Sequence, residues 1–200
     1  MPRDTLADVS DETLLVLYAN GDREASRVLT TRLAPRILGF AMRLLSDRAE
    51  AEDVTQETML RLWRQAPNWR SGEAQVSTWA YRVATNLCTD LRRARGRRPG
   101  VAFDDAPEVA DGAQGAVAVM IQTDRMAALQ DALAHLPDRQ RQAVVLRHIE
   151  GLTNPEIGQI MDIGVEAVES LTARGKRALS AILAGRKAEL GYDNEQEVET

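Results

Sequence analysis

The chain has 200 residues, of which 44% are hydrophobic, 28% charged and only 4% aromatic, a composition typical of a soluble globular protein. Its single cysteine, Cys88, excludes an internal disulfide framework, and no apolar run approaches the roughly 20 residues that a membrane-spanning helix requires. Because the first residues contain no apolar segment of the kind found in signal peptides, we expect a cytoplasmic protein without membrane insertion.

The formal net charge of −5 is unevenly distributed along the chain. Two segments, residues 101–118 and 189–200, together hold nine acids and no basic residue. Without those nine acids, 25 basic and 21 acidic side chains remain, a balance of +4. We interpret both acidic segments as solvated, disordered chain, which leaves a basic remainder that can meet a negatively charged partner.

Composition also divides the chain into parts. Residues 99–119 are rich in Pro, Gly, Ala and Asp and lack helical periodicity, which predicts a flexible linker. Apolar residues recur at helical spacing on both sides of it, with no useful strand-like alternation. We therefore predict an all-α protein of two small helical domains, residues 1–98 and 120–185, followed by an acidic tail over residues 186–200.

Four helices are predicted in the N-terminal part, at about residues 11–19, 23–45, 48–65 and 78–95. Asp47 and Glu50 form a capping-box pair before the third helix, and Ser77 is expected to cap the fourth. Pro35 marks a point at which the second helix could kink or divide.

The predicted helix 48–65 carries an anomaly on its polar side. Projection at 100° per residue places a mixed charged and apolar set opposite the core-facing residues: Asp53, Gln56, Glu57, Leu60 and Arg64. Leu60 then lies at the centre of a charged, exposed face. A single exposed leucine is common on protein surfaces, whereas an apolar centre with a polar rim is also the anatomy of a docking surface.

The predicted helix 78–95 presents a polar stripe without any carboxylate: Arg82, Thr85, Asn86, Thr89 and Arg93. It continues into the run RRARGRR, whose five arginines are Arg92, Arg93, Arg95, Arg97 and Arg98. Guanidinium groups attract phosphates, and hydroxyl or amide groups can hydrogen-bond bases or sugars, so this stripe indicates nucleic-acid binding. A solvated basic helix end, stabilised by the helix dipole, is the competing interpretation.

A loop with an aromatic side chain, QAPNWRSGEAQ, precedes that helix. Trp69 beside Arg70 could stack an unpaired base, although a tryptophan in such a place more often packs into the core.

The C-terminal part is predicted to hold helices at about residues 122–135, 138–150, 156–161 and 165–183. Thr153 and Glu156 form a capping box, Gly151 is expected to end the second of these helices, and residues 162–164 form a short turn containing glycine. A short helix, such a turn and a longer helix together indicate a helix-turn-helix.

The last predicted helix exposes acids early and cations late on one face: Glu166, Glu169, Ser170, Ala173, Arg174, Lys176 and Arg177. The late cations would meet phosphates. The early acids lie where a recognition helix meets base edges, and a glutamate can accept a hydrogen bond from cytosine. They are equally explained as partners of the helix dipole, and both interpretations remain open.

No catalytic or metal-binding constellation is visible in the sequence. His135 and His148 lie on different predicted helices without metal-ligand spacing, and no phosphate-cradling glycine loop or nucleophile elbow occurs. We expect no metal, no cofactor and no enzymatic activity.

Three stretches in order resemble an extracytoplasmic-function (group IV) sigma factor of RNA polymerase: AEDVTQETMLRLWR, STWAYRVATNLCTDLRRARGRR and LPDRQRQAVVLRHIEGLTNPEIGQIMDIGVEAVESLTARGKRAL. The resemblance covers residues 11 to about 183. It implies that the Leu60 face docks on core RNA polymerase and that the stripe from Arg82, with Trp69 and the arginines, binds and melts the promoter −10 element. It also implies that the exposed face of helix 165–183 reads the −35 element.

The same resemblance implies promoter DNA and a cognate anti-sigma factor as partners, and a monomer when free of them. This sequence departs from the family pattern at Gly164, where many members have a serine N-cap, and at Leu171, where many have a basic residue. These departures concern the −35 element and its binding strength.

Two other functions compete with a sigma factor. A free-standing helix-turn-helix regulator would bind duplex DNA by itself, normally as a dimer on paired half-sites, and would leave the Leu60 face without a role. A sigma-like decoy would bind an anti-sigma factor instead of polymerase, and would have no use for the arginine run.

Overall fold

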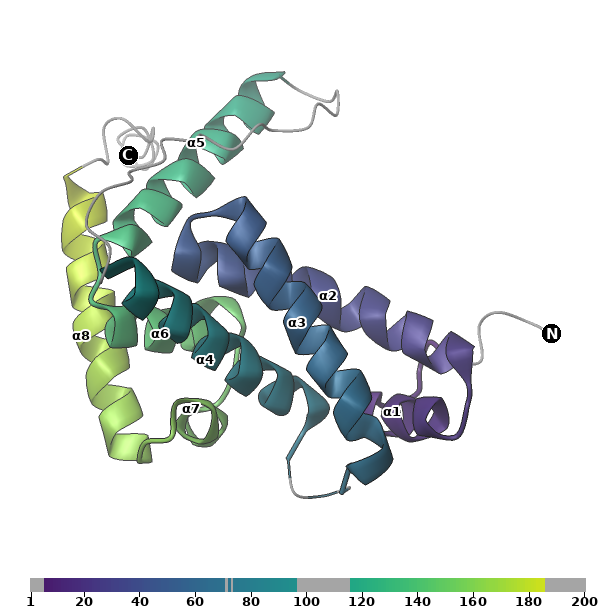
Figure 1. Ribbon diagram of the computed structural model, residues 1–200. Helices are drawn as coiled ribbons and strands as arrows, with labels where there is room; N and C mark the ends of the chain where they lie inside the picture. The colour runs from purple at the N-terminus through teal and green to yellow at the C-terminus, as the bar shows by residue number, and fades with distance from the viewer. Residues whose placement is uncertain (1–5, 71, 73, 97–115, 186–200) are drawn as a thin grey trace, which may run out of the picture.

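The computed structural model describes residues 6–70, 72, 74–96 and 116–185, with side chains from residue 125 onward in the last stretch (Figure 1). All regular structure in these residues is helical, which confirms the predicted all-α class. The predicted tail and nearly all of the predicted linker, up to residue 115, lie outside the described residues. The domain boundaries therefore stay a prediction.

The helices of the N-terminal half are α1 (Asp11–Ala19), α2 (Arg23–Leu45), α3 (Arg48–Gln65), the short 3-10 helix η1 (Ala66–Asn68) and α4 (Val76–Gly96). Side-chain oxygens accept hydrogen bonds from the first backbone N–H groups of three of them: Ser10 for α1, Asp22 for α2 and Asp47 for α3. Helix α2 runs as one helix through Pro35, which lies on its exposed side, so the chain does not divide there.

The predicted start of α4 is wrong by two residues. Val76 is already helical and buried, so Ser77 lies inside the first turn instead of capping the helix. Burial of Val76 against α1, α2 and α3 residues extends the helix beyond the point that the hydroxyl alone suggests.

The C-terminal half consists of α5 (Ala116–Ala134), α6 (Asp138–Val144), the π-helical turn η2 (Val145–Ile149), α7 (Asn154–Met161) and α8 (Val165–Ala184). The capping box of Thr153 and Glu156 is present at the start of α7, and Gly151 has a φ of +75° after η2. As expected from Gly164, the N-terminus of α8 has no side-chain cap. Helices α7 and α8 form the predicted helix-turn-helix.

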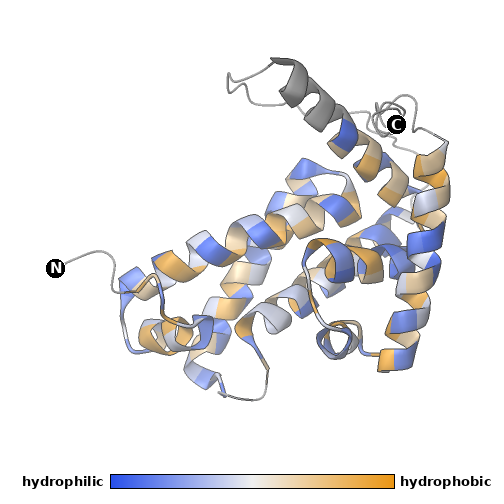
Figure 2. Ribbon diagram, turned by 180° about the vertical axis from the view of Figure 1, so that it is seen from behind, coloured by the Kyte–Doolittle hydropathy of each residue, from blue (hydrophilic) through white to orange (hydrophobic). Residues whose placement is uncertain are grey.

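The N-terminal half has a hydrophobic core of its own. Leu14 and Leu15 of α1 pack with the first half of α2, with Leu62 of α3 and with Val76 of α4. Tyr18 and Trp63 contact each other at 4.7 Å between ring centroids on the margin of this cluster. Hydrophobic residues recur along the helices at helical spacing, as Figure 2 shows in orange.

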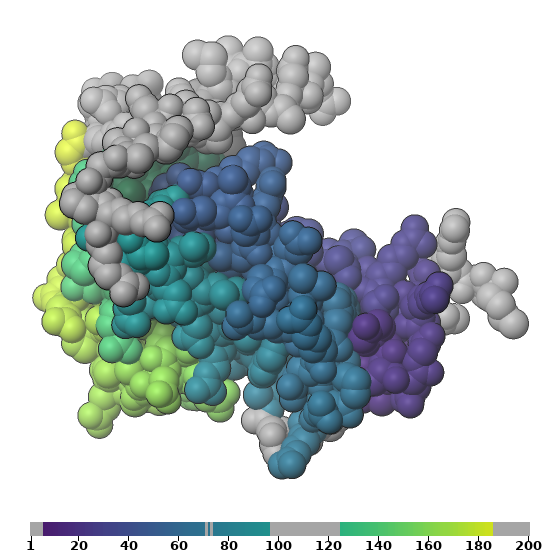
Figure 3. All heavy atoms as spheres, in the orientation of Figure 1, coloured from purple at the N-terminus to yellow at the C-terminus, as the bar shows by residue number. Residues whose placement is uncertain are grey.

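A second, larger core is shared by the two halves. Its buried residues come from α2, α3 and α4 on one side and from α5, α6, η2, α7 and α8 on the other. Helix α4 packs against α7, and α2 packs against α5, α6 and η2. The C-terminal helices therefore lie directly on the N-terminal domain (Figures 1 and 3), with α7 packed against α4 and side chains of α6 bonded to it.

Candidate functional site

Helix α3 presents the predicted docking face to solvent. Asp53, Gln56, Leu60 and Arg64 are exposed, and Glu57 is half-buried and accepts a hydrogen bond from Arg61 at 2.7 Å. Leu60 keeps 41% of its surface accessible. The predicted residues of this face thus lie together on one side of α3.

Leu60 also borders an apolar groove of about 330 Å³ between α2 and α3, here called the α2/α3 groove. It is lined by Thr30, Ala34, Leu38, Glu52, Thr55, Gln56, Met59, Leu60 and Trp63. Sequence reasoning missed the contribution of α2. The spacing of Thr30, Ala34 and Leu38 at four-residue intervals was the available signal, because such residues share one helix face.

The polar stripe of α4 is only partly exposed. Arg82, Asn86 and Arg93 reach solvent, whereas Thr89 is half-buried and accepts a hydrogen bond from Gln142 Nε2 of α6 at 3.0 Å. Thr85, predicted to be exposed, is 4% exposed, so this prediction is wrong. The reason is tertiary, because α7 packs against α4 and Gln142 of α6 bonds to Thr89, one turn further along the side that periodicity assigned to solvent.

The arginines after Leu91 divide into three groups. Arg92 donates to the Leu44 carbonyl at 2.9 Å and pairs with Asp138 of α6 at 2.7 Å. Arg95 pairs with Asp47 and Glu50 and donates to the Leu45 carbonyl. Arg93 is exposed, and Arg97 and Arg98 lie outside the described residues.

Trp69 follows η1 and packs on the N-terminal core. Its ring is half-buried, edge-to-face with Trp79 at 6.3 Å, and its indole N–H is buried without a hydrogen-bond acceptor among the described residues. This packing agrees with the interpretation that Trp69 is a core residue. Its indole N–H, however, has no acceptor among the described residues.

Helix α8 exposes every residue of its predicted DNA-facing side: Glu166, Glu169, Ser170, Ala173, Arg174, Lys176 and Arg177. The opposite side is held by Val168 and Gly175, which are buried. A Cβ at Gly175 would meet Val144 Cγ2 at 2.6 Å and the Gln140 carbonyl oxygen at 3.1 Å, so this glycine permits the close approach of α8 to α6.

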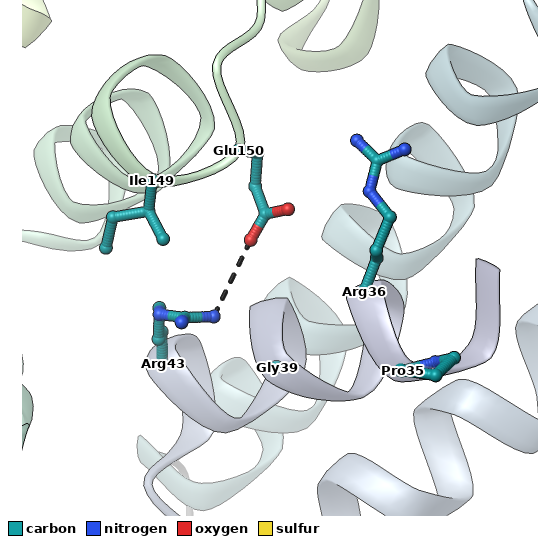
Figure 4. A pocket seen from close by; sticks show the side chains of 6 residues that line it. All are labelled: Pro35, Arg36, Gly39, Arg43, Ile149 and Glu150. Carbon is teal, nitrogen blue, oxygen red and sulfur yellow. Dashed lines mark ion pairs between the residues drawn. The ribbon is translucent and has the colours of Figure 1, made fainter. Parts of the chain in front are cut away.

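A polar cluster that the sequence did not predict joins the two halves. Glu150 follows η2, has a side chain only 8% exposed, and lies 3.6 Å from Arg43 of α2. The Tyr81 hydroxyl of α4 donates a hydrogen bond to its other carboxylate oxygen. Figure 4 shows Glu150 reaching towards α2 in a cleft of about 410 Å³ that Arg36 also lines.

This cluster changes the acidity of its tyrosine. Burial, and next the hydrogen bond to Glu150, raise the pKa of Tyr81 well above its ordinary value of about 10. Arg36 lies over the Tyr81 ring at 5.6 Å and acts in the opposite direction, with a smaller effect. Tyr81 is therefore a neutral hydrogen-bond donor at physiological pH.

Arg141 of α6 is a second link between the halves and is 2% exposed. Its guanidinium donates to the carbonyls of Leu44 at the end of α2 and of Leu136 before α6, at 2.9 and 3.1 Å. Burial, and next the charge of Arg92, lower its pKa to about 10, so it stays charged at neutral pH. Its charge is balanced by the negative end of α2.

The described residues hold no group of three or more His, Cys, Asp or Glu side chains arranged to bind a metal ion. Among the helices that the structure describes, none is long and apolar enough to cross a bilayer.

Comparison with known proteins assigns the two halves. The sequence matches the family models for sigma-70 region 2, over residues 29–98, and sigma-70 region 4, over residues 126–179. The RNA polymerase sigma-H factor of Pseudomonas aeruginosa is 31% identical over 187 residues, which cover 89% of this chain and 96% of the relative. The ECF RNA polymerase sigma factor SigE of Mycolicibacterium smegmatis is 36% identical over 181 residues, which cover 87% of this chain and 68% of the relative.

Sigma-70 factors direct RNA polymerase in the initiation of transcription, and both domain models are theirs. The chain belongs to the extracytoplasmic-function (ECF) group of this sigma-70 family. It is thereby a transcription initiation factor, as the sequence resemblance implied.

Solved structures agree with the fold. CnrH in complex with the cytosolic domain of CnrY has a TM-score of 0.66 at 23% identity and covers 88% of this chain and 97% of its own. The sigma factor RpoE in complex with the anti-sigma factor NepR from Bartonella quintana has a TM-score of 0.64 at 22% identity. The match covers 78% of this chain and 94% of the RpoE chain.

Proposed function

We propose that this sigma factor binds core RNA polymerase through the exposed face of α3 and the α2/α3 groove. The observation that carries the proposal is Leu60, an exposed apolar side chain between a nearly uncharged groove and a rim formed by Asp53, Gln56 and Arg64. Apolar centres with polar rims are the usual anatomy of protein interfaces. Promoter selectivity then comes from this chain, and catalysis comes from the polymerase.

Helix α4 contacts the −10 element in this proposal. Arg82 and Asn86 face solvent on adjacent turns, and Arg93 extends the same helix towards Arg97 and Arg98. Cations attract the phosphate backbone, while amides and hydroxyls bond to bases. Trp69 and its loop lie at the other end of this helix, where an unpaired base would be received.

Helix α8 contacts the −35 element. Its base-facing residues are Glu166, Glu169, Ser170 and Ala173, and its later cations, Arg174, Lys176 and Arg177, meet phosphates.

The packed arrangement of the two halves must open for this function. Thr85, Thr89 and Arg92 belong to the proposed −10 surface, yet Thr85 is buried and the other two are bonded to side chains of α6. A sigma factor in this arrangement cannot present α4 fully to DNA. Core polymerase would supply the binding free energy that separates the halves.

We also propose regulation by an anti-sigma factor that covers the packed form. The two fold neighbours above were solved with partners, CnrY and the anti-sigma factor NepR. An anti-sigma factor that binds the α2/α3 groove would compete directly with polymerase. The cytoplasm, where transcription takes place, is the proposed site of action.

The decisive experiment compares Leu60→Asp with Val16→Asp. Both residues are apolar and about equally exposed, at 41% and 40%, but Val16 lies on α1. We expect Leu60→Asp to weaken binding to bacterial core polymerase roughly tenfold or more and to abolish sigma-dependent run-off transcription, because it places a charge at the centre of the interface. Val16→Asp should bind and transcribe like the wild type.

Equal behaviour of the two variants would refute the proposed docking face. Promoter binding without polymerase, undiminished by Leu60→Asp, would instead indicate a free-standing regulator. Failure of the wild-type protein to bind core polymerase, with binding to an anti-sigma factor intact, would indicate a decoy.

A further inference from the structure

The two acids in the first half of α8 lie on its exposed, DNA-facing side. A carboxylate close to DNA is repelled by the phosphates, so each acid needs a reason to be there. The structure separates the two cases.

Glu166 is explained by the stability of α8 itself. It is the second residue of the helix, after Gly164, which provides no side-chain cap. A carboxylate in the first turn stabilises the unpaired backbone N–H groups and the positive end of the helix dipole. The stability of the helix is therefore a sufficient reason for an acid at this position.

Glu169 is not explained in this way. It is the fifth residue of α8, beyond the first turn, in which the dipole effect is concentrated. The positions three and four residues further on, where a helical ion-pair partner would stand, are occupied by Thr172 and Ala173.

The carboxylate of Glu169 is held instead by a residue of the preceding helix. Asn154 Nδ2, on the first residue of α7, donates a hydrogen bond to Glu169 Oε1 at 3.3 Å. Asn154 is itself half-buried, directly after Thr153, whose hydroxyl and backbone N–H are both bonded to Glu156. The contact therefore joins a well-anchored helix start to the exposed face of α8 and leaves Glu169 Oε2 available.

We propose that Asn154 orients Glu169 to read a cytosine in the −35 element. This inference rests on the proposed function of α8. Glu169 accepts from one of the two N–H groups of the Asn154 amide, and the carboxylate that this bond holds in place offers only acceptors to a base. In the major groove cytosine offers the N4 amino group as a donor, whereas adenine places the N7 acceptor beside its amino group and repels a carboxylate.

Asn154 is a positioning residue in this scheme, and Glu169 is the specificity-determining residue. Ordering the carboxylate before binding reduces the conformational entropy that its contact with the base would otherwise cost. The hydrogen bond between Asn154 and Glu169 thus accounts for an acid at position 169 on the DNA-facing side of α8.

The test uses the full-length protein with core RNA polymerase on a promoter library randomised over the −35 element. The wild type should favour C at one position by ~10-fold or more in transcript yield, the scale of a good base contact. Glu169→Gln should reduce that preference to less than about threefold at this position alone, and Asn154→Ala should reduce it partially. Glu169 is exposed and Asn154 is only half-buried, so melting temperatures should stay near that of the wild type.

The possible outcomes distinguish a failure of the cytosine proposal from a failure of the proposed sigma function. Transcripts without a C preference, a preference for A at the position, or a loss of C preference in Glu166→Gln instead of Glu169→Gln would each overturn the cytosine proposal and leave the sigma function intact. An absence of any protein-dependent transcript from the whole library, with active polymerase and folded protein, would overturn the proposed function and the inference with it.

Discussion

Arg141 shows how a single side chain can serve the packing of two halves. It is buried, and its planar guanidinium bonds to backbone carbonyls from α2 and from the α5–α6 connection. Lysine cannot replace this geometry, because its ammonium group is a compact point charge without a planar fork.

Replacement of Arg141 should therefore be costly. Arg141→Met would remove the side-chain donor to the Ala134 and Leu136 carbonyls, while Arg92 still donates to the Leu44 carbonyl. We expect it to lower the free energy of unfolding by about 2–4 kcal/mol. Chemical denaturation monitored by circular dichroism measures this. Arg177→Met, on the exposed face of α8, is the control and should change stability by less than ~0.5 kcal/mol. A similar small effect for both variants would contradict the packing role.

Cys88 is predicted to be chemically silent. Burial, and next the charge of Glu50, raise the pKa of its thiol to about 12. Because the thiolate is the reactive form, the native protein at pH 8 should react with a disulfide reagent on the order of a thousandfold more slowly than a free cysteine. Full reactivity should return in denaturant. Rapid labelling of the native protein would show that α4 leaves its packed position frequently.

At the scale of the elements, the approach of α8 to α6 depends on Gly175. Glycine inside a helix normally costs about 1 kcal/mol relative to alanine, yet a Cβ here would contact both the buried Val144 side chain and the Gln140 backbone. The Gln140 backbone oxygen cannot move independently of α6. The steric clash of an added Cβ at position 175 should therefore outweigh the higher helix propensity of alanine.

Gly175→Ala should thus destabilise the protein by roughly 1–3 kcal/mol. Adding Val144→Ala removes the shorter of the two contacts and should recover part of the loss relative to the sum of the single changes. Gly96→Ala, at the end of α4 with open space around it, should be neutral or slightly stabilising. Thermal unfolding of these variants measures all three effects, and a stabilising Gly175→Ala would show that α8 does not pack this closely.

At the scale of the whole molecule, the packing of the two halves should become less stable at alkaline pH. The pKa of Tyr81 is raised in the folded protein, so above about pH 10 the unfolded chain releases this proton while the folded protein retains it. The stabilising contribution is complete below that pH and is lost as the pH rises through the folded-state pKa.

The measurement is unfolding free energy against pH, together with tyrosinate absorbance. The wild type should lose stability above about pH 10 more steeply than Tyr81→Phe, which has no proton to release at this position. Identical slopes would mean that Tyr81 titrates normally and that its bond to Glu150 does not persist in solution.

Much of the fold followed from local patterns. Asp47 and the Thr153–Glu156 pair cap helices as predicted, because capping depends on residues a few positions apart. The exposed faces of α3 and α8 also agree with helical periodicity. The family could be inferred because its motifs are contiguous stretches.

The sequence by itself determined the helices, the helix-turn-helix, the position of the exposed Leu60 and the family. Only the tertiary structure decided that Thr85 is buried, that Arg92 and Arg95 are engaged within the protein, and that Glu150, Tyr81 and Arg43 meet. Contacts within a helix are set by its fixed period, whereas these contacts join residues about 45 to 110 positions apart and depend on how amphipathic helices share a common core. No spacing along the chain encodes that choice.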